Sequence, residues 1–197
     1  MDITRNMNGA RALVVGAGLA LAVGASPTPA MAAGRVGTTK VMVRTEIDNI
    51  EFKAPTVIPF VAQADGTLQG PSEDATTIDN LSAYGIHVTN MKIDAMNTWT
   101  IAADAKTGTA QNSIDFKVGP GGALQDASAA TQGTGIDLSK NATFDMGYQG
   151  IAGGSDKIKL KTSGNVARVT RDIFHITGEG DQVATITWTV EPGAHTA

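Results

Sequence analysis

The chain has 197 residues, with 15 Lys and Arg against 19 Asp and Glu, a formal net charge of −4, and no cysteine. Disulfides and cysteine-ligated zinc sites are therefore excluded. The basic residues do not gather with aromatic residues into one run. The sequence thus predicts no nucleic-acid partner and no attraction to an anionic membrane surface.

The amino terminus has the pattern of a secretory signal. Arg5 and Arg11 give it a positive charge, residues 12–25 form an uncharged run of small and apolar side chains, and Ala30-Met31-Ala32 is an A-x-A site. These are the parts that a signal peptidase reads. The sequence predicts a signal peptide over residues 1–32 and a secreted product. The apolar run is shorter than the ~20 residues that span a bilayer, so no membrane association is expected after cleavage.

The remaining residues, 33–197, are expected to form a single domain. Their number is sufficient to bury a sizeable core without cross-links. Without Asp2, Arg5 and Arg11 they hold 13 basic and 18 acidic residues, a net charge of −5. A complete lack of cysteine in an exported chain suits a Gram-positive type of cell, where the protein would be located at the cell surface or in the cell wall.

The first half of this domain contains short patterns typical of strands. Residues 40–44 and 47–52 alternate loosely between apolar and other side chains. Residues 57–62 are rich in β-formers, but Pro59 confines such a strand to an edge or a bulge. Asp65-Gly66 then predicts a hairpin turn.

A better patterned region follows. Residues 76–80 lead to a strand over 85–93, in which Ile86 and Val88 face the core together with Met91 and Ile93. The two pairs are out of phase, which predicts a β-bulge near Asn90.

The second half continues in the same way. Further strands are predicted at 98–101, 113–118, 157–162, 166–169 and 184–190, and residues 119–154 indicate loops with short strands or a helical turn. Strands that recur about every 8–12 residues with turns between them are typical of a sandwich or barrel. The predicted fold is an all-β sandwich of antiparallel strands.

Five aspartates recur at spacings of ten or eleven residues: Asp94, Asp104, Asp115, Asp126 and Asp137. Two interpretations are open, a repeated calcium-binding unit and a recurrence of turns. The flanking residues do not repeat and match no calcium loop. Because an aspartate can cap its own turn, the pattern favours turns, and no metal or cofactor is expected.

No catalytic constellation is visible. His87, His175 and His195 have no metal-ligand spacing, and a G-x-S-x-G turn for a serine nucleophile is absent. A Ser, His and Asp set assembled from distant positions stays open. The sequence favours a protein that is not an enzyme and has no catalytic residues.

Two tryptophans have similar surroundings: Thr98-Trp99-Thr100-Ile101 and Thr187-Trp188-Thr189-Val190. In each, a Thr and then an aliphatic residue follow the Trp. This pair resembles the two motifs of the WxL domain of Gram-positive surface proteins, although Ile101 and Val190 stand where that family has leucine. The resemblance implies non-covalent association with the cell wall, through peptidoglycan, or assembly with other surface proteins. It transfers Trp99, Ile101, Trp188 and Val190 as motif residues.

Two questions stay open at this point. Each tryptophan either packs in the core or stacks on sugar rings of the wall, and the two-residue spacing to its aliphatic partner favours the core. The leading function is a secreted, non-catalytic protein bound to wall peptidoglycan. The alternative is a structural subunit of a surface fibre or pilus-like homo-oligomer, in which residues 33–56 are donated as a strand to a neighbour.

Overall fold

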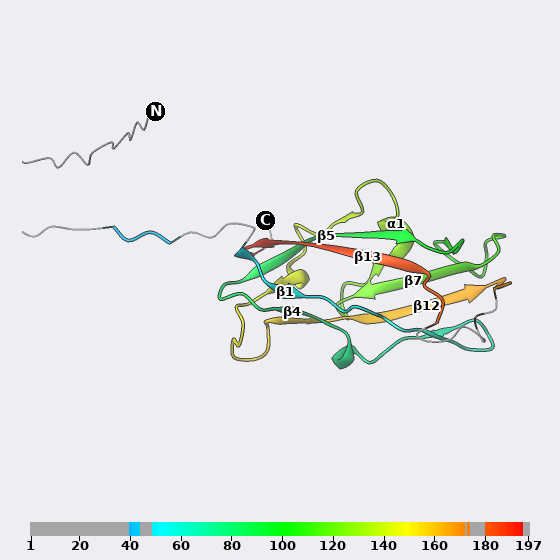
Figure 1. The fold of residues 1–197 in the computed structure, drawn as a ribbon, viewed down its shortest axis with the longest axis horizontal. Coiled ribbons are helices and arrows are strands. Elements are labelled where there is room, and N and C mark those ends of the chain that lie inside the picture. Colours follow the sequence, from blue (N-terminus) through cyan, green and yellow to red (C-terminus); the bar gives the residue numbers. More distant parts are fainter. Residues whose placement is uncertain (1–39, 44–48, 172, 174–179, 195–197) are drawn as a thin grey trace, which may run out of the picture. The chain divides into compact units, whose positions relative to one another are not determined.

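The computed structural model describes residues 40–43, 49–171, 173 and 180–194. The predicted signal peptide lies outside these residues. The chain divides into two compact units, residues 1–42 and 43–197, and the fold described here is that of the second. It is mostly β, with several small antiparallel sheets and one short helix (Figure 1).

The two larger sheets have four strands each. One has the order β10 (Asp145–Met146), β5 (Ile86–Ala95) and β13 (Ala184–Pro192), with β9 (Ile136–Asp137) also on β5. The other has the order β12 (Lys161–Ala167), β7 (Ser113–Gly119) and β6 (Thr100–Ile101), with β8 (Gln125–Asp126) also on β7. The β6–β7 pair is parallel.

The remaining elements are shorter. A three-stranded sheet has the order β1 (Phe52–Lys53), β4 (Thr77–Asn80) and β11 (Lys157–Lys159), and a hairpin joins β2 (Val61–Ala62) to β3 (Leu68–Gln69). The helix α1 spans Ala127–Ala130, and the 3-10 turns η2 and η3 span Glu73–Ala75 and Ala142–Phe144. These pieces agree with the prediction of short strands and a helical turn within residues 119–154.

The longest pairing joins β5 to β13, and it contains the predicted bulge. Thr189 lies opposite Asn90, but Val190 lies opposite Val88, so Thr89 has no partner in the ladder. The extra residue lets Ile86 and Val88 face the core together with Met91 and Ile93, all four of which are buried. The phase change in the sequence was a sound indicator of this bulge.

The predicted hairpin is also confirmed. Its turn has Gly66 at φ 84°, and the backbone N–H of Thr67 donates to the Asp65 carboxylate over 2.9 Å. Residues 57–60, however, pair with no strand, and only Val61–Ala62 of the predicted 57–62 strand does so. Pro59 cannot donate to a ladder, which agrees with the late start of this strand.

Three other expectations are wrong in part. Residues 40–43 form no strand, and β1 includes only Phe52 of the predicted 47–52 strand, of which residues 47–48 lie outside the described part. The predicted 166–169 strand ends at Ala167. Arg168 has φ 52° and its guanidinium donates to the Ala110 carbonyl, which turns the chain out of the ladder.

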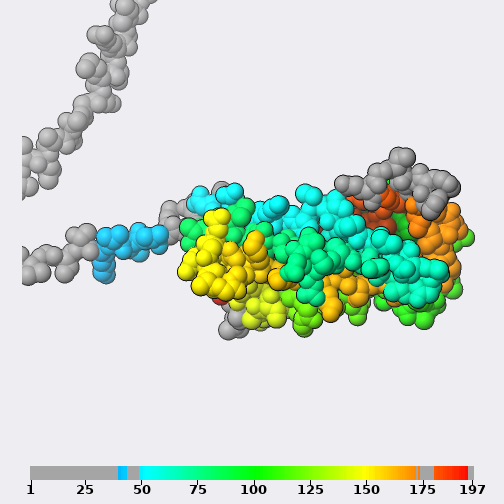
Figure 2. All heavy atoms as spheres, turned by 90° about the horizontal axis from the view of Figure 1, so that it is seen from below, coloured from blue at the N-terminus to red at the C-terminus, as the bar shows by residue number. Residues whose placement is uncertain are grey.

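One hydrophobic core serves these sheets. It includes Ile78 of β4, Ile93 of β5, Phe116 of β7 and Val190 of β13, all buried. Figure 2 shows residues 49–62 spread along the outside of one face of the domain.

Candidate functional site

Trp99, the centre of the first motif, is buried, with 6% of its surface exposed. Asn97 and Thr98 precede it with φ of 51° and 65°, a left-handed pair that is unusual for residues with side chains. This turn brings the indole N–H toward Asp181, to which it donates over 2.9 Å. Trp99 itself precedes β6, so the first motif is only partly a strand.

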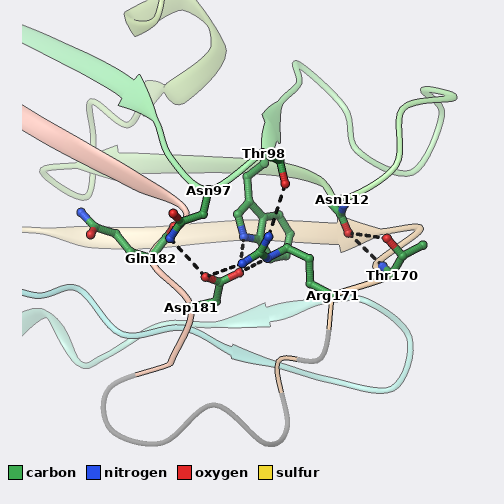
Figure 3. A network of polar contacts seen from close by, with 8 residues as sticks. Asn97, Thr98, Asn112, Thr170, Arg171, Asp181 and Gln182 are labelled. Atoms are coloured by element: carbon green, nitrogen blue, oxygen red, sulfur yellow. Dashed lines mark hydrogen bonds and ion pairs between the residues drawn. The ribbon is translucent and has the colours of Figure 1, made fainter.

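The Asp181 carboxylate connects several segments. It accepts from Trp99 and from the Asn97 amide over 3.3 Å, and it forms an ion pair with Arg171 (Figure 3). Burial acts to raise the pKa of Asp181, but the hydrogen bonds from Arg171 and Trp99 and the Arg171 charge outweigh it and lower that pKa. The carboxylate is therefore held in its charged form.

Arg171 extends this network to a second turn. Its guanidinium also donates to the Thr98 hydroxyl over 3.3 Å, and the neighbouring Thr170 N–H donates to the Asn112 side chain over 2.9 Å. These contacts fasten the end of the segment after β12 to the turns that lead into β6 and β7 (Figure 3). The network has a structural role, because its polar and charged side chains form hydrogen bonds and an ion pair with one another.

The second motif lies in another sheet. Trp188 is half-buried in β13 opposite Met91, and Val190 is buried opposite Val88. Both face inward, as the two-residue spacing predicts. Ile101, half-buried in β6, and Trp99 contribute to the same core cluster. The structure thus gathers the four motif residues in the core and exposes neither tryptophan as a flat platform.

An apolar groove of about 820 Å³ lies beside Trp99. Its floor includes Phe116 and Ile114 of β7, and residues 55–62 and 183–186 also line it. Val57, Val61 and Ile173 at this groove are 45%, 61% and 39% exposed, whereas most large apolar residues of the unit are buried. Sequence reasoning missed the groove, because it needs segments that are about 120 residues apart.

A row of exposed lysines follows β11 and the start of β12, which belong to two different sheets. Lys157, Lys159 and Lys161 alternate with buried Ile158 and Leu160, and all three are exposed. Lysines of neighbouring strands extend the row. Lys53 of β1 and Lys157 of β11 lie opposite Asp79 of β4, one on each side, and Lys117 of β7 lies opposite Ser163 of β12. These are five of the eight lysines after residue 46.

Four carboxylates accompany this lysine row, and one of them is Glu73, whose charge acts on Lys159. Asp79 and Asp74 pair with Lys157 and Lys159 over 3.1 and 2.6 Å, and Asp126 lies opposite Lys117. The row still has an excess of positive charge, whereas residues 46–197 together hold 10 basic and 18 acidic residues. The sequence shows the 157–161 alternation, but the pairing of strands is needed to bring Lys53 and Lys117 beside it.

His87 and Asp145 form a pair that the sequence does not predict. His87 is 2% exposed; its Nδ1 lies 2.6 Å from an Asp145 carboxylate oxygen and its Nε2 lies 2.9 Å from the Leu138 carbonyl. Both ring nitrogens thus face acceptors. The pair joins β5 to β10 and does not line the groove.

Three of the five recurring aspartates cap turns, as the favoured interpretation predicts, and two do not. Asp104, Asp126 and Asp137 each accept a hydrogen bond from the backbone N–H two residues further on. Bonds from the backbone of Thr107 and Lys106 lower the pKa of Asp104. Asp115 accepts instead from the Ala105 and Asn165 backbone N–H groups, and Asp94 forms an ion pair with Lys92.

Among the described residues, no three His, Cys, Asp or Glu side chains are grouped so as to hold a metal ion. No helix in this part of the chain is both long and apolar enough to cross a bilayer. The chain matches no protein-family model, no curated protein and no solved structure.

Proposed function

We propose that this chain is a secreted, non-catalytic surface protein that associates non-covalently with the cell wall through peptidoglycan. The amino-terminal signal pattern supports export. The two Trp motifs support a WxL-like domain in which Trp99, Ile101, Trp188 and Val190 hold the core. In this proposal the two larger sheets pack face to face as a β-sandwich, and the shared core cluster supports that packing.

The lysine row is the observation that carries this proposal. Peptidoglycan bears free carboxylates on its peptide stems, and a row of ammonium groups on neighbouring strands of two sheets complements such a polymer. Each exposed ion pair contributes only about 0–1 kcal/mol, so several must act together. The tryptophans are not exposed for stacking, and the wall contact is therefore assigned to Lys53, Lys117, Lys157, Lys159 and Lys161.

Sedimentation with insoluble peptidoglycan tests this function. Residues 33–197 are expected to pellet with the polymer at low ionic strength and to be released as salt screens the exposed charges. A known wall-binding domain treated in parallel shows that the pellet is intact. No retention of the chain at low salt, with retention of that domain, would contradict the proposal.

A further inference from the structure

The groove beside Trp99 has the properties of an acceptor for an added strand. β13 pairs with β5 on one side and with no other strand of the described part, and its first residues line the groove. No hydrogen bond joins the backbone of residues 54–60, which also line the groove, to another described residue. Among the described residues, therefore, none occupies these backbone groups, with which an incoming strand would pair.

The side chains of the groove select an apolar strand. Phe116, Ile114 and Val118 of β7 form an apolar floor, and Val57 and Val61 stay partly exposed at its rim. Trp99 lines the groove, but its indole N–H is already bonded to Asp181. Exposed apolar clusters of this kind mark interaction sites.

The segment Lys40-Val41-Met42-Val43 has the composition of an apolar strand that fits this groove. Val41, Met42 and Val43 are 87%, 88% and 95% exposed, and no other run of three consecutive large apolar residues in the described part is exposed. Val is a strong β-former. In an extended conformation Val41 and Val43 share one face, and Lys40 and Met42 share the other.

The opposite charges of the donor segment and of the domain also favour residues 40–43 as the added strand. Residues 33–45 contain Arg35, Lys40 and Arg44 and no acidic residue, whereas residues 46–197 hold 10 basic and 18 acidic residues. A basic, apolar strand and an acidic domain attract one another during encounter. The two parts are therefore complementary between copies of the chain.

We propose that residues 40–43 of one copy add as a strand to β13 in the groove of a second copy, and that this contact links copies head to tail. The donor is shorter than residues 33–56. Phe52 and Lys53 already pair with Asn80 and Asp79 of their own chain, and the Glu51 carbonyl accepts from Leu81. Because each copy holds one donor and one acceptor, the contact is heterologous, and the assembly grows with concentration by addition of further copies. It does not depend on wall binding.

Light scattering of residues 33–197 over a range of concentrations tests this proposal. The wild type is expected to rise above the monomer mass. A donor variant, Val41→Asp with Val43→Asp, and an acceptor variant, Val57→Asp with Val61→Asp, are each expected to stay monomeric. All four residues are exposed, so both variants should fold, which circular dichroism checks. Met96→Asp with Tyr148→Asp, exposed residues outside the groove, should assemble as the wild type does.

Mixing the two defective variants gives the sharpest result. The donor variant retains its groove and the acceptor variant retains its strand, so the mixture should form a dimer of twice the monomer mass and nothing larger. A monomeric wild type, a donor variant that assembles fully, a control variant that stays monomeric, or a mixture without dimer would each overturn the proposal. Insertion of residues 40–43 into their own groove would give the first of these outcomes.

Discussion

At the scale of single residues, the contact between Trp99 and Asp181 connects the first motif to the segment before β13. The indole N–H is a donor to the Asp181 carboxylate, whose side chain is 6% exposed. Bonds to charged groups contribute about 1.5–3 kcal/mol, so Trp99→Phe is expected to lower the free energy of unfolding by about 2 kcal/mol. Trp188→Phe is the matched control. The indole N–H of the half-buried Trp188 has no hydrogen-bond partner among the described residues, and the loss of stability is expected to be about 1 kcal/mol or less. Equal losses in urea unfolding would contradict this difference.

Asp181 also predicts a pH dependence at this scale. Its pKa in the folded chain lies below the ordinary value of 3.8. A carboxyl with a lowered pKa stabilises the fold fully above its unfolded value and loses that effect as the pH falls through the folded value. Between about pH 6 and about pH 3, Asp181→Asn should therefore lose less stability than the wild type. Because the other aspartates are present in both proteins, their contribution cancels in this comparison. An identical loss of stability in both proteins would contradict the role assigned to Asp181.

At the scale of elements, the ladder between β12 and β7 leaves no room for a side chain at Gly164. A Cβ on this residue would lie 2.2 Å from the Asp115 carbonyl oxygen and 2.9 Å from the Phe116 Cα. These are backbone atoms within a ladder, so they cannot move aside cheaply.

Gly164→Ala is accordingly expected to lower the free energy of unfolding by about 1–3 kcal/mol. Gly121→Ala is its control, because nothing lies within 4 Å of a Cβ there. Thermal unfolding followed by circular dichroism measures both. A Gly164 variant as stable as the Gly121 variant would contradict the steric conflict between the added Cβ and β7.

The elements also show how far the sequence could be used. The phase change from Ile86 and Val88 to Met91 and Ile93 predicted both a strand and its bulge, because a buried face leaves a two-residue period in the sequence. Asp65-Gly66 predicted its hairpin for a local reason as well. Residues 40–43 have the same local pattern but no ladder partner among the described residues. Pattern alone does not supply a partner.

The candidate surfaces were less predictable than the strands. The role of Trp188 and Val190 followed from spacing within one strand. The bond from Trp99 to Asp181 spans 82 positions, and the groove and the lysine row depend on which strands pair. Long-range pairing leaves no mark in the local residue order, so these features required the structure.

At the scale of the whole molecule, we propose separate surfaces for separate tasks. In this proposal the core holds the motif residues, the lysine row contacts the wall, and the groove joins copies. Wall retention should then be independent of assembly. The variant Val57→Asp with Val61→Asp is expected to pellet with peptidoglycan as the wild type does, because it leaves every lysine in place. Loss of retention in this variant would mean that the groove, or assembly through it, contributes to wall binding.

The central claim is that the lysine row binds the wall, and one comparison tests it most directly. Lys157→Gln, Lys159→Gln and Lys161→Gln are combined in one protein, and Lys92→Gln, Lys106→Gln and Lys140→Gln in a second with the same net charge. Both are sedimented with peptidoglycan at low salt. We predict that the variant at residues 157, 159 and 161 loses most of its retention, while the variant at residues 92, 106 and 140 is retained nearly as well as the wild type. Equal retention of the two variants would contradict it, because net charge or another surface would then determine binding.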